Sequence, residues 1–148
     1  MRRPEMAELL DLEPHPEGGW FRQTWRSLVT IRPEGYDGER FAGTAIYYLI
    51  EPGKRSRWHS VRSEELWLWH SGGPLTLHLA GVATHPAEPA EQVTIGPDVT
   101  AGHYPQFVVP AGVWQSAEPT SDRSALVTCV VIPGFDYADF RFATRAES

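Results

Sequence analysis

The chain has 148 residues, of which 41% are hydrophobic and 22% charged, and its formal net charge is −6 at pH 7. This length suits one domain with one core, so we expect a single domain over residues 1–148, and the negative charge argues against nucleic-acid binding. Cys129 is the only cysteine, and no apolar run follows residues 1–5. We therefore expect a cytoplasmic protein without disulfides or membrane segments.

Thirteen glycines and thirteen prolines divide the chain into short segments, which favours strands over long helices. Apolar residues at Met6, Leu9 and Leu10 predict a short helix within residues 4–12, ended by Pro14. The glycines and proline of residues 31–40 predict a loop. Strands are predicted over residues 20–27, 41–50, 57–61, 65–70, 75–80, 93–95, 107–109 and 125–132.

The turn residues between these strands indicate how they are connected. Gly72 and Gly73 separate two of the strands and predict a hairpin between them. Cys129 lies in the apolar run 125–132, so we expect a buried core thiol. Many short strands with turn residues between them are typical of an antiparallel sandwich or barrel, which predicts an all-β fold.

A histidine and a glutamate lie between two turn glycines within residues 53–72. Alternate side chains of a strand share a face, so His59 points with Val61, and Glu65 points with two tryptophans. A cavity that is mostly aromatic and holds two polar groups has the usual character of a ligand pocket. The predicted lining is His59, Val61, Glu65, Trp67 and Trp69.

Two further segments add side chains to this predicted cavity. Pro110 and Gly112 predict a tight turn that aims Gln115 back into the barrel. Tyr47 and Tyr48 occupy opposite faces of one predicted strand, so only one of them can face the cavity. We predict Tyr47 as the ligand contact and keep Tyr48 as the alternative.

Together these segments resemble the paired motifs of the cupin superfamily. The positions of the two motifs that match are Gly53, His59, Glu65, Gly72, Pro110 and Gly112. Val61 and Gln115 stand where two histidines of those motifs belong. Residues 14–21, 44–49 and 133–140 are further similar to a subgroup of short single-domain cupins known as a domain of unknown function.

This resemblance implies a cupin barrel (a double-stranded β-helix, or jelly roll), a small-molecule ligand, and a homodimer paired through barrel edges. Cupins that bind Fe, Mn, Ni, Zn or Cu hold the ion with three histidines and a glutamate. His59, Glu65 and Gln115 are the candidate metal ligands that remain here. Because two imidazoles are replaced, we favour a hydrogen-bonded His59–Glu65 pair without metal, and keep a weakly bound divalent ion as the alternative.

Two classes of function remain open. In an isomerase or epimerase, His59 would transfer the proton, Glu65 would orient it, and Gln115 would bind a substrate oxygen. A metal-assisted variant would use the same three residues. In a non-catalytic binding or sensing barrel, the cavity would hold a small polar or cyclic organic molecule without converting it.

Overall fold

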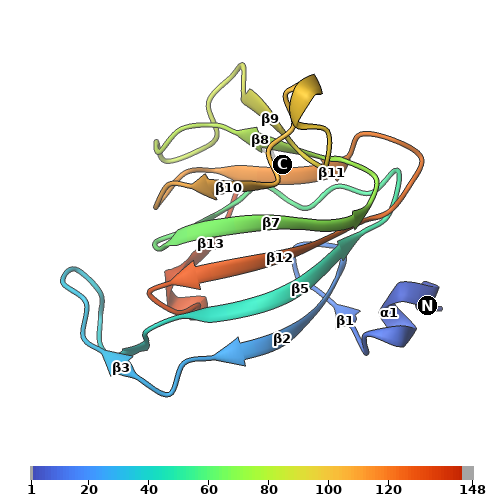
Figure 1. The fold of residues 1–148 in the computed structure, drawn as a ribbon. Helices are drawn as coiled ribbons and strands as arrows, with labels where there is room; N and C mark the ends of the chain where they lie inside the picture. Colours follow the sequence, from blue (N-terminus) through green and yellow to red (C-terminus); the bar gives the residue numbers. More distant parts are fainter. Residues whose placement is uncertain (1, 145–148) are drawn as a thin grey trace.

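The structure, a computed structural model, describes residues 2–144 and consists of two antiparallel sheets that enclose one core (Figure 1). The larger sheet has the strand order β1 (Glu13–Pro14), β2 (Trp20–Arg26), β5 (Thr44–Ile50), β12 (Ala125–Ile132), β7 (Glu64–Gly72) and β10 (Gln106–Val109). The smaller sheet has the order β13 (Phe140–Phe142), β6 (His59–Val61), β11 (Gln115–Pro119), β8 (Leu75–Leu79) and β9 (Glu91–Ile95). The predicted all-β jelly-roll barrel with a short N-terminal helix is confirmed.

Shorter elements complete the fold. The helix α1 (Glu5–Leu9) lies beside β1, and the 3₁₀ turns η1 (Val99–Ala101) and η2 (Tyr137–Asp139) precede β10 and β13. Strands β3 (Thr30–Ile31) and β4 (Arg40–Phe41) pair with each other at the base of the predicted loop, which projects from the barrel (Figure 1). No helix in the described part of the chain is long and apolar enough to cross a membrane.

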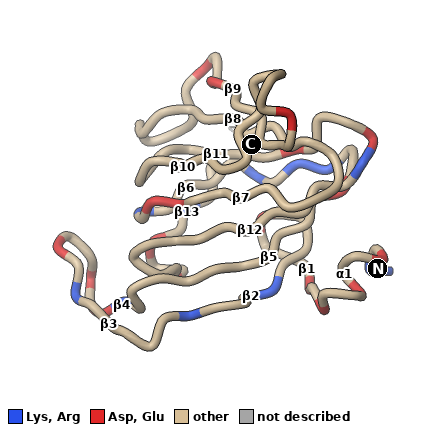
Figure 2. Tube along the Cα trace, in the orientation of Figure 1, with Lys and Arg blue, Asp and Glu red and all other residues tan. Residues whose placement is uncertain are grey.

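Strand β12 shows why the sequence forms this architecture. Its alternate residues Ala125, Val127, Cys129 and Val131 are buried on the face toward the smaller sheet. Leu126 is buried on the opposite face, in a second cluster with residues of α1 and β2. The inner face of β12 is buried along its length and the outer face is partly covered, and neither β12 nor its neighbour β5 carries a charged residue, as Figure 2 shows.

The predicted hairpin at Gly72 and Gly73 is wrong. Strand β7 belongs to the larger sheet and β8 to the smaller one, so these residues form a corner between sheets. Gly72 has φ +86°, and a Cβ there would collide with the carbonyl oxygen of Ser124. The sequence analysis also missed β11, because a proline and several polar residues hide its strand pattern.

A buried ion pair fixes one end of the barrel. Arg40 donates from Nε to Oδ2 of Asp139 at 2.8 Å and from Nη2 to Oδ1 at 2.9 Å. Arg40 also reaches Oδ1 of Asp37 at 2.6 Å. Two parallel bonds to one carboxylate fix both distance and orientation. The pair therefore ties β4 to η2 and positions the segment of residues 135–140 over the barrel end.

The second cluster generates a test of the role of the N-terminal segment. Leu12 is fully buried between Ala7 and Trp20, so we expect Leu12→Ala to lower the free energy of unfolding by about 2–5 kcal/mol. Leu9 on α1 is 73% exposed, so Leu9→Ala should change it by less than about 0.5 kcal/mol. Urea denaturation measures both, and equal effects would contradict this packing.

Candidate functional site

A cavity of about 260 Å³ lies inside the barrel and is lined by side chains from both sheets and from two loops. Polar side chains of the lining come from the turn between β1 and β2 and from several strands, whereas hydrocarbon and aromatic side chains form the rest. The lining residues are His15, Glu17, Phe21, Gln23, Thr44, Ile46, Tyr48, His59, Val61, Glu65, Cys129, Val131, Phe135, Tyr137 and Phe140.

His59 is the first residue of β6 and is 2% exposed. Its Nδ1 lies 2.7 Å from the carbonyl oxygen of Arg57, which can only accept, so Nδ1 carries a proton. Its Nε2 lies 3.1 Å from Oε2 of Glu17. The ring also stacks on Phe140, with 5.4 Å between ring centroids. These contacts fix the ring and leave Nε2 as the nitrogen that can gain or lose a proton.

Glu17 lies in the turn between β1 and β2, which several hydrogen bonds hold against the barrel. Its backbone N–H donates to Nδ1 of His15 at 3.0 Å, and its carbonyl accepts from the Arg57 N–H at 2.8 Å. Tyr48 donates its hydroxyl to the Gly18 carbonyl at 2.5 Å. Gly19 has φ +80°, and a Cβ there would lie 2.7 Å from the Tyr48 ring, so only glycine allows this approach.

Glu65 lies on β7 and is 8% exposed. Its Oε1 accepts from Nε2 of Gln115 at 2.8 Å, and the thiol of Cys129 also hydrogen-bonds to this carboxyl. Oε1 of Gln115 is buried without a hydrogen-bond partner among the described residues. If the Gln115 amide turned by 180°, that oxygen would accept a proton from a neutral Glu65. Gln115 can therefore stabilise either protonation state of Glu65.

Burial raises the pKa of Glu17 to about 8, and the nearby Tyr48 hydroxyl partly opposes the shift. Burial, with repulsion from Glu17, raises the pKa of Glu65 to about 7. Burial lowers the pKa of His59 below its usual value, although Glu65 opposes the change. The raised pKa of Glu17 and the lowered pKa of His59 together favour a single proton at the 3.1 Å contact, held by Glu17, and the raised pKa of Glu65 favours its protonated form more than in water.

The structure places the sequence-predicted residues at different depths. His59, Val61 and Glu65 all line the cavity. Gln115 lies behind Glu65 and is joined to it by the amide–carboxyl hydrogen bond. In addition, Gln115 lies directly opposite His59 in the pairing of β11 with β6. The two motifs thus meet at this pair of strands.

The predicted placement of Tyr47 and of the two tryptophans needs correction. Tyr48 faces the cavity, whereas Tyr47 lies on the outer face of β5, beside Arg22 and His70. Trp67 is 1% exposed and packs in the main core beyond the cavity, 6.0 Å from the Tyr48 ring. Trp69 packs against the same core and donates from Nε1 to the Gly73 carbonyl. Trp67 and Trp69 lie on the predicted inward face of β7. They pack in the core beyond the cavity, however, and do not line it.

The sequence analysis missed Glu17 as a member of the site. A glutamate within His15-Pro16-Glu17-Gly18-Gly19 was visible as part of a turn, but the pattern gave no sign that the turn folds into the barrel. In the structure Gly18 and Gly19 both have positive φ, at 105° and 80°, which the sequence alone does not reveal. They permit the close approach that buries Glu17.

The residues present do not fit a metal ion. Nε2 of His59 faces Glu17, Oε1 of Glu65 accepts from Gln115, and Val61 offers no ligand. Within residues 2–144, no group of three or more His, Cys, Asp or Glu side chains is placed to hold a metal ion.

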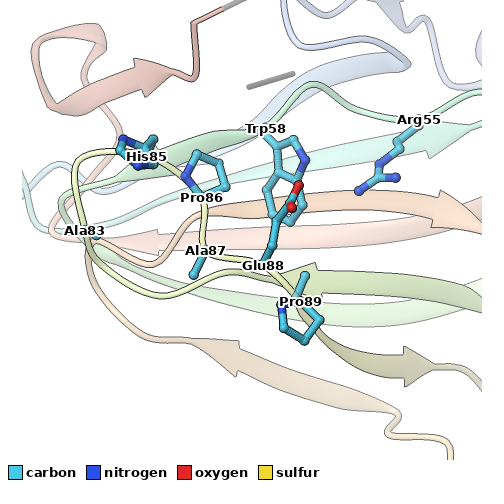
Figure 3. A pocket seen from close by; sticks show the side chains of 9 residues that line it. Arg55, Trp58, Ala83, His85, Pro86, Ala87, Glu88 and Pro89 are labelled. Carbon is cyan, nitrogen blue, oxygen red and sulfur yellow. The ribbon is translucent and has the colours of Figure 1, made fainter. Parts of the chain in front are cut away.

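A larger hollow of about 1060 Å³ lies outside the barrel (Figure 3). Arg55 and Trp58 form one side of it, and residues 83–90 form the other. Arg55 already bonds to Ser116 at 2.7 Å and lies 3.5 Å from Glu118, and its guanidinium lies over the Trp58 ring. This hollow contains no buried acid, so the smaller cavity is the better candidate site despite its size.

Comparison with known proteins is consistent with this architecture. Residues 4–143 match the family described as Cupin superfamily (DUF985). An uncharacterised protein of Saccharomyces cerevisiae is 30% identical over 143 residues, which cover 86% of this chain and 68% of the yeast protein. A hypothetical protein from Leishmania major superposes with a TM-score of 0.85 at 33% identity, covering 95% of this chain and 86% of that one. A protein from Shewanella oneidensis gives 0.84 at 31% identity, covering 99% and 87%.

The raised carboxyl pKa values predict how stability depends on pH. Folded Glu17 keeps a proton that the unfolded chain releases near its ordinary pKa of 4.5, so its stabilising contribution falls as pH rises toward about 8. Glu17→Gln should make the fall in unfolding free energy between pH 6.5 and 8 shallower, by up to about 1.4 kcal/mol per pH unit.

Urea denaturation at several pH values measures this slope. His15, whose pKa is lowered to about 4, and His59 act in the opposite direction, but only below about pH 6.5. The exposed neighbour Glu64 offers a matched control, because Glu64→Gln should leave the slope unchanged. Identical slopes for wild type and Glu17→Gln would show that Glu17 is not buried in protonated form.

Proposed function

The chain belongs to the Cupin superfamily (DUF985) family, and we propose that its barrel cavity binds a small polar or cyclic organic molecule and exchanges a proton with it. The observation that carries this proposal is the 3.1 Å contact between His59 Nε2 and Glu17 Oε2 inside the cavity. Perturbed titratable groups that converge in one enclosed cavity are typical of proton-transfer sites.

The geometry favours isomerase or epimerase chemistry of a particular form. The Arg57 carbonyl holds the proton on Nδ1 of His59, so His59 exchanges its proton through Nε2, and Glu17 is the direct partner there. This role was predicted for Glu65. Glu65 instead supplies a second proton-transfer group, held by Gln115. A two-base epimerisation removes a proton from one side of a carbon and returns one from the other, and the Glu17–His59 pair and Glu65 would be the two groups.

A non-catalytic binding or sensing barrel is the alternative. The apolar and aromatic part of the lining, including Ile46, Val131 and Phe135, supports binding without any chemistry. A divalent ion at His59, Glu65 and Gln115 stays a prediction that the arrangement of donors does not favour. A cytoplasmic location likewise stays a prediction.

Hydrogen–deuterium exchange tests the proton-transfer proposal. A panel of small cyclic carbonyl compounds and sugars is incubated with the protein in D2O, and NMR follows exchange at carbon. We expect catalysed exchange for at least one compound, with Glu17→Gln and His59→Gln each lowering the rate by about 100-fold or more. Thermal-shift titration should show that both variants still bind that compound.

Glu64→Gln is the control, because Glu64 lies next to Glu65 on β7 but is exposed. It should exchange at the wild-type rate. Binding without exchange across the whole panel would reject proton transfer and favour the binding barrel. Full exchange activity in His59→Gln would reject the role given to His59.

We also propose that the chain forms a homodimer through the free edge of β2. In the described residues, β1 covers only Trp20 and Phe21 of this strand, so the outer edge from Arg22 to Arg26 has no strand partner. Close to this edge, Trp25 is 48% exposed and Leu28 is 95% exposed. Pairing with the same edge of a second copy would satisfy the free backbone groups and cover the apolar side chains.

Light scattering coupled to size-exclusion chromatography measures the predicted dimer. We expect a mass of two chains for wild type and of one chain for Trp25→Glu. Val82 is exposed and apolar but lies on the loop between β8 and β9, so Val82→Glu should stay dimeric. A monomeric wild type would reject the proposal, and a dimeric Trp25→Glu would reject this interface.

A further inference from the structure

The cavity contains two buried carboxyl groups, and the basic groups of its described lining are the imidazoles of His15 and His59, whose pKa values burial lowers. Glu17 and Glu65 are both buried in it, and none of its described lining residues is Lys or Arg. The neighbouring arginines have other partners, since Arg57 lies 3.8 Å over the ring centre of Phe142, and Arg40 pairs with Asp139. Buried carboxyls in proteins are usually paired with a cation, so this lining leaves a counter-charge to be supplied by the ligand.

The hydrogen-bonding groups of the cavity show the same imbalance. The Tyr48 hydroxyl already donates to Gly18, and the Gln115 amide already donates to Glu65. At the two carboxyls the remaining capacity lies on acceptors, because the four oxygens of Glu17 and Glu65 have more lone pairs than the Gln115 amide occupies. A ligand group that only donates hydrogen bonds would complete this set, and an ammonium is such a group.

The other walls suit an organic cation. Phe135 meets Tyr137 and Phe140 edge to face, with ring centroids 5.0 and 5.7 Å apart, and all three line the cavity. Phe21 and Tyr48 line it from β2 and β5. Aromatic rings attract cations through the negative charge of their faces, and desolvation strengthens this attraction.

We propose that the ligand of this cavity is a small organic amine bound as its ammonium ion, with the charged nitrogen between Glu17 and Glu65 and its hydrocarbon part against the aromatic side chains. This inference rests on the proposed function, because it assumes that the cavity holds a small molecule. An anionic ligand is disfavoured, since a carboxylate or phosphate would lie against two acidic groups in a described lining that contains no Lys or Arg.

Matched sets of compounds test the charge requirement. Isothermal titration calorimetry at pH 7 compares benzylamine, benzyl alcohol and benzoate, and then cyclohexylamine, cyclohexanol and cyclohexanecarboxylate. We expect each amine to bind at least about tenfold more tightly than its alcohol, as one charge-assisted hydrogen bond predicts, and the two acids not to bind.

Substitutions then locate the charge. Glu65→Gln and Glu17→Gln should each weaken amine binding about tenfold or more and leave alcohol binding within about threefold. Glu64→Gln should leave amine binding unchanged, because Glu64 is exposed outside the cavity. Circular dichroism checks that each variant is folded, and the alcohol titration confirms that its cavity is intact.

Several outcomes would overturn the inference. Alcohols or acids that bind as tightly as the amines would reject the ammonium class. Such a result would still show a cavity that binds small molecules. Amines that bind equally well to both glutamine variants would show that another surface holds them. Absence of binding by both amines at millimolar concentration would also reject it, whereas the exchange test with neutral carbonyl compounds would still decide the proposed function.

Discussion

The burial of two carboxyl groups and an imidazole inside an apolar barrel is the constraint on which the rest of this site depends. Transferring a charge from water into such an interior is costly, so Glu17, His59 and Glu65 are stable there only as a hydrogen-bonded and largely neutral set. The 3.1 Å contact between His59 and Glu17 allows one proton to serve both groups. The Gln115 amide stabilises Glu65 in a similar way, at 2.8 Å.

This constraint explains why several contacts hold the turn that carries Glu17. His15 accepts from the backbone of Glu17, Tyr48 bonds to Gly18, and Gly19 packs directly on the Tyr48 ring. His15 accepts through Nδ1 and is therefore neutral at that nitrogen, consistent with its pKa of about 4. A turn held at three consecutive residues loses little entropy when a ligand binds, which favours a preformed cavity over one that assembles around its ligand.

The fold was more predictable from the sequence than the site, for physical reasons. Strands such as β12 and β5 have long apolar runs that no other element would bury as well, so local pattern was enough to find them. The corner at Gly72 was misread as a hairpin, because two glycines permit either connection and only the long-range pairing of β7 with β12 selects the corner. Val61 and Glu65 were placed correctly by strand parity, whereas Tyr47 was not, because parity alone does not say which face of β5 turns inward. Predicting Glu17 as a site residue would have required knowing that the turn between β1 and β2 folds against the barrel. Such a long-range contact leaves no local pattern in the sequence.

The same arrangement explains why this barrel suits proton chemistry or ligand binding better than metal binding. A metal ligand must direct its free lone pair at the ion, and two or more further ligands must converge on the same point. Here Nε2 of His59 meets a carboxyl oxygen of Glu17, and the positions nearest to it in the pairing of β6 and β11 are the apolar Val61 and the amide Gln115. The second imidazole of the cavity, His15, uses Nδ1 to accept from the Glu17 backbone, so His59 is satisfied by a proton on Glu17 instead. A buried proton shared between two bases is itself a reactive group, because a ligand that enters the cavity competes for the same hydrogen bond. The Glu17–His59 contact therefore both stabilises the empty barrel and is the first interaction that a ligand would change.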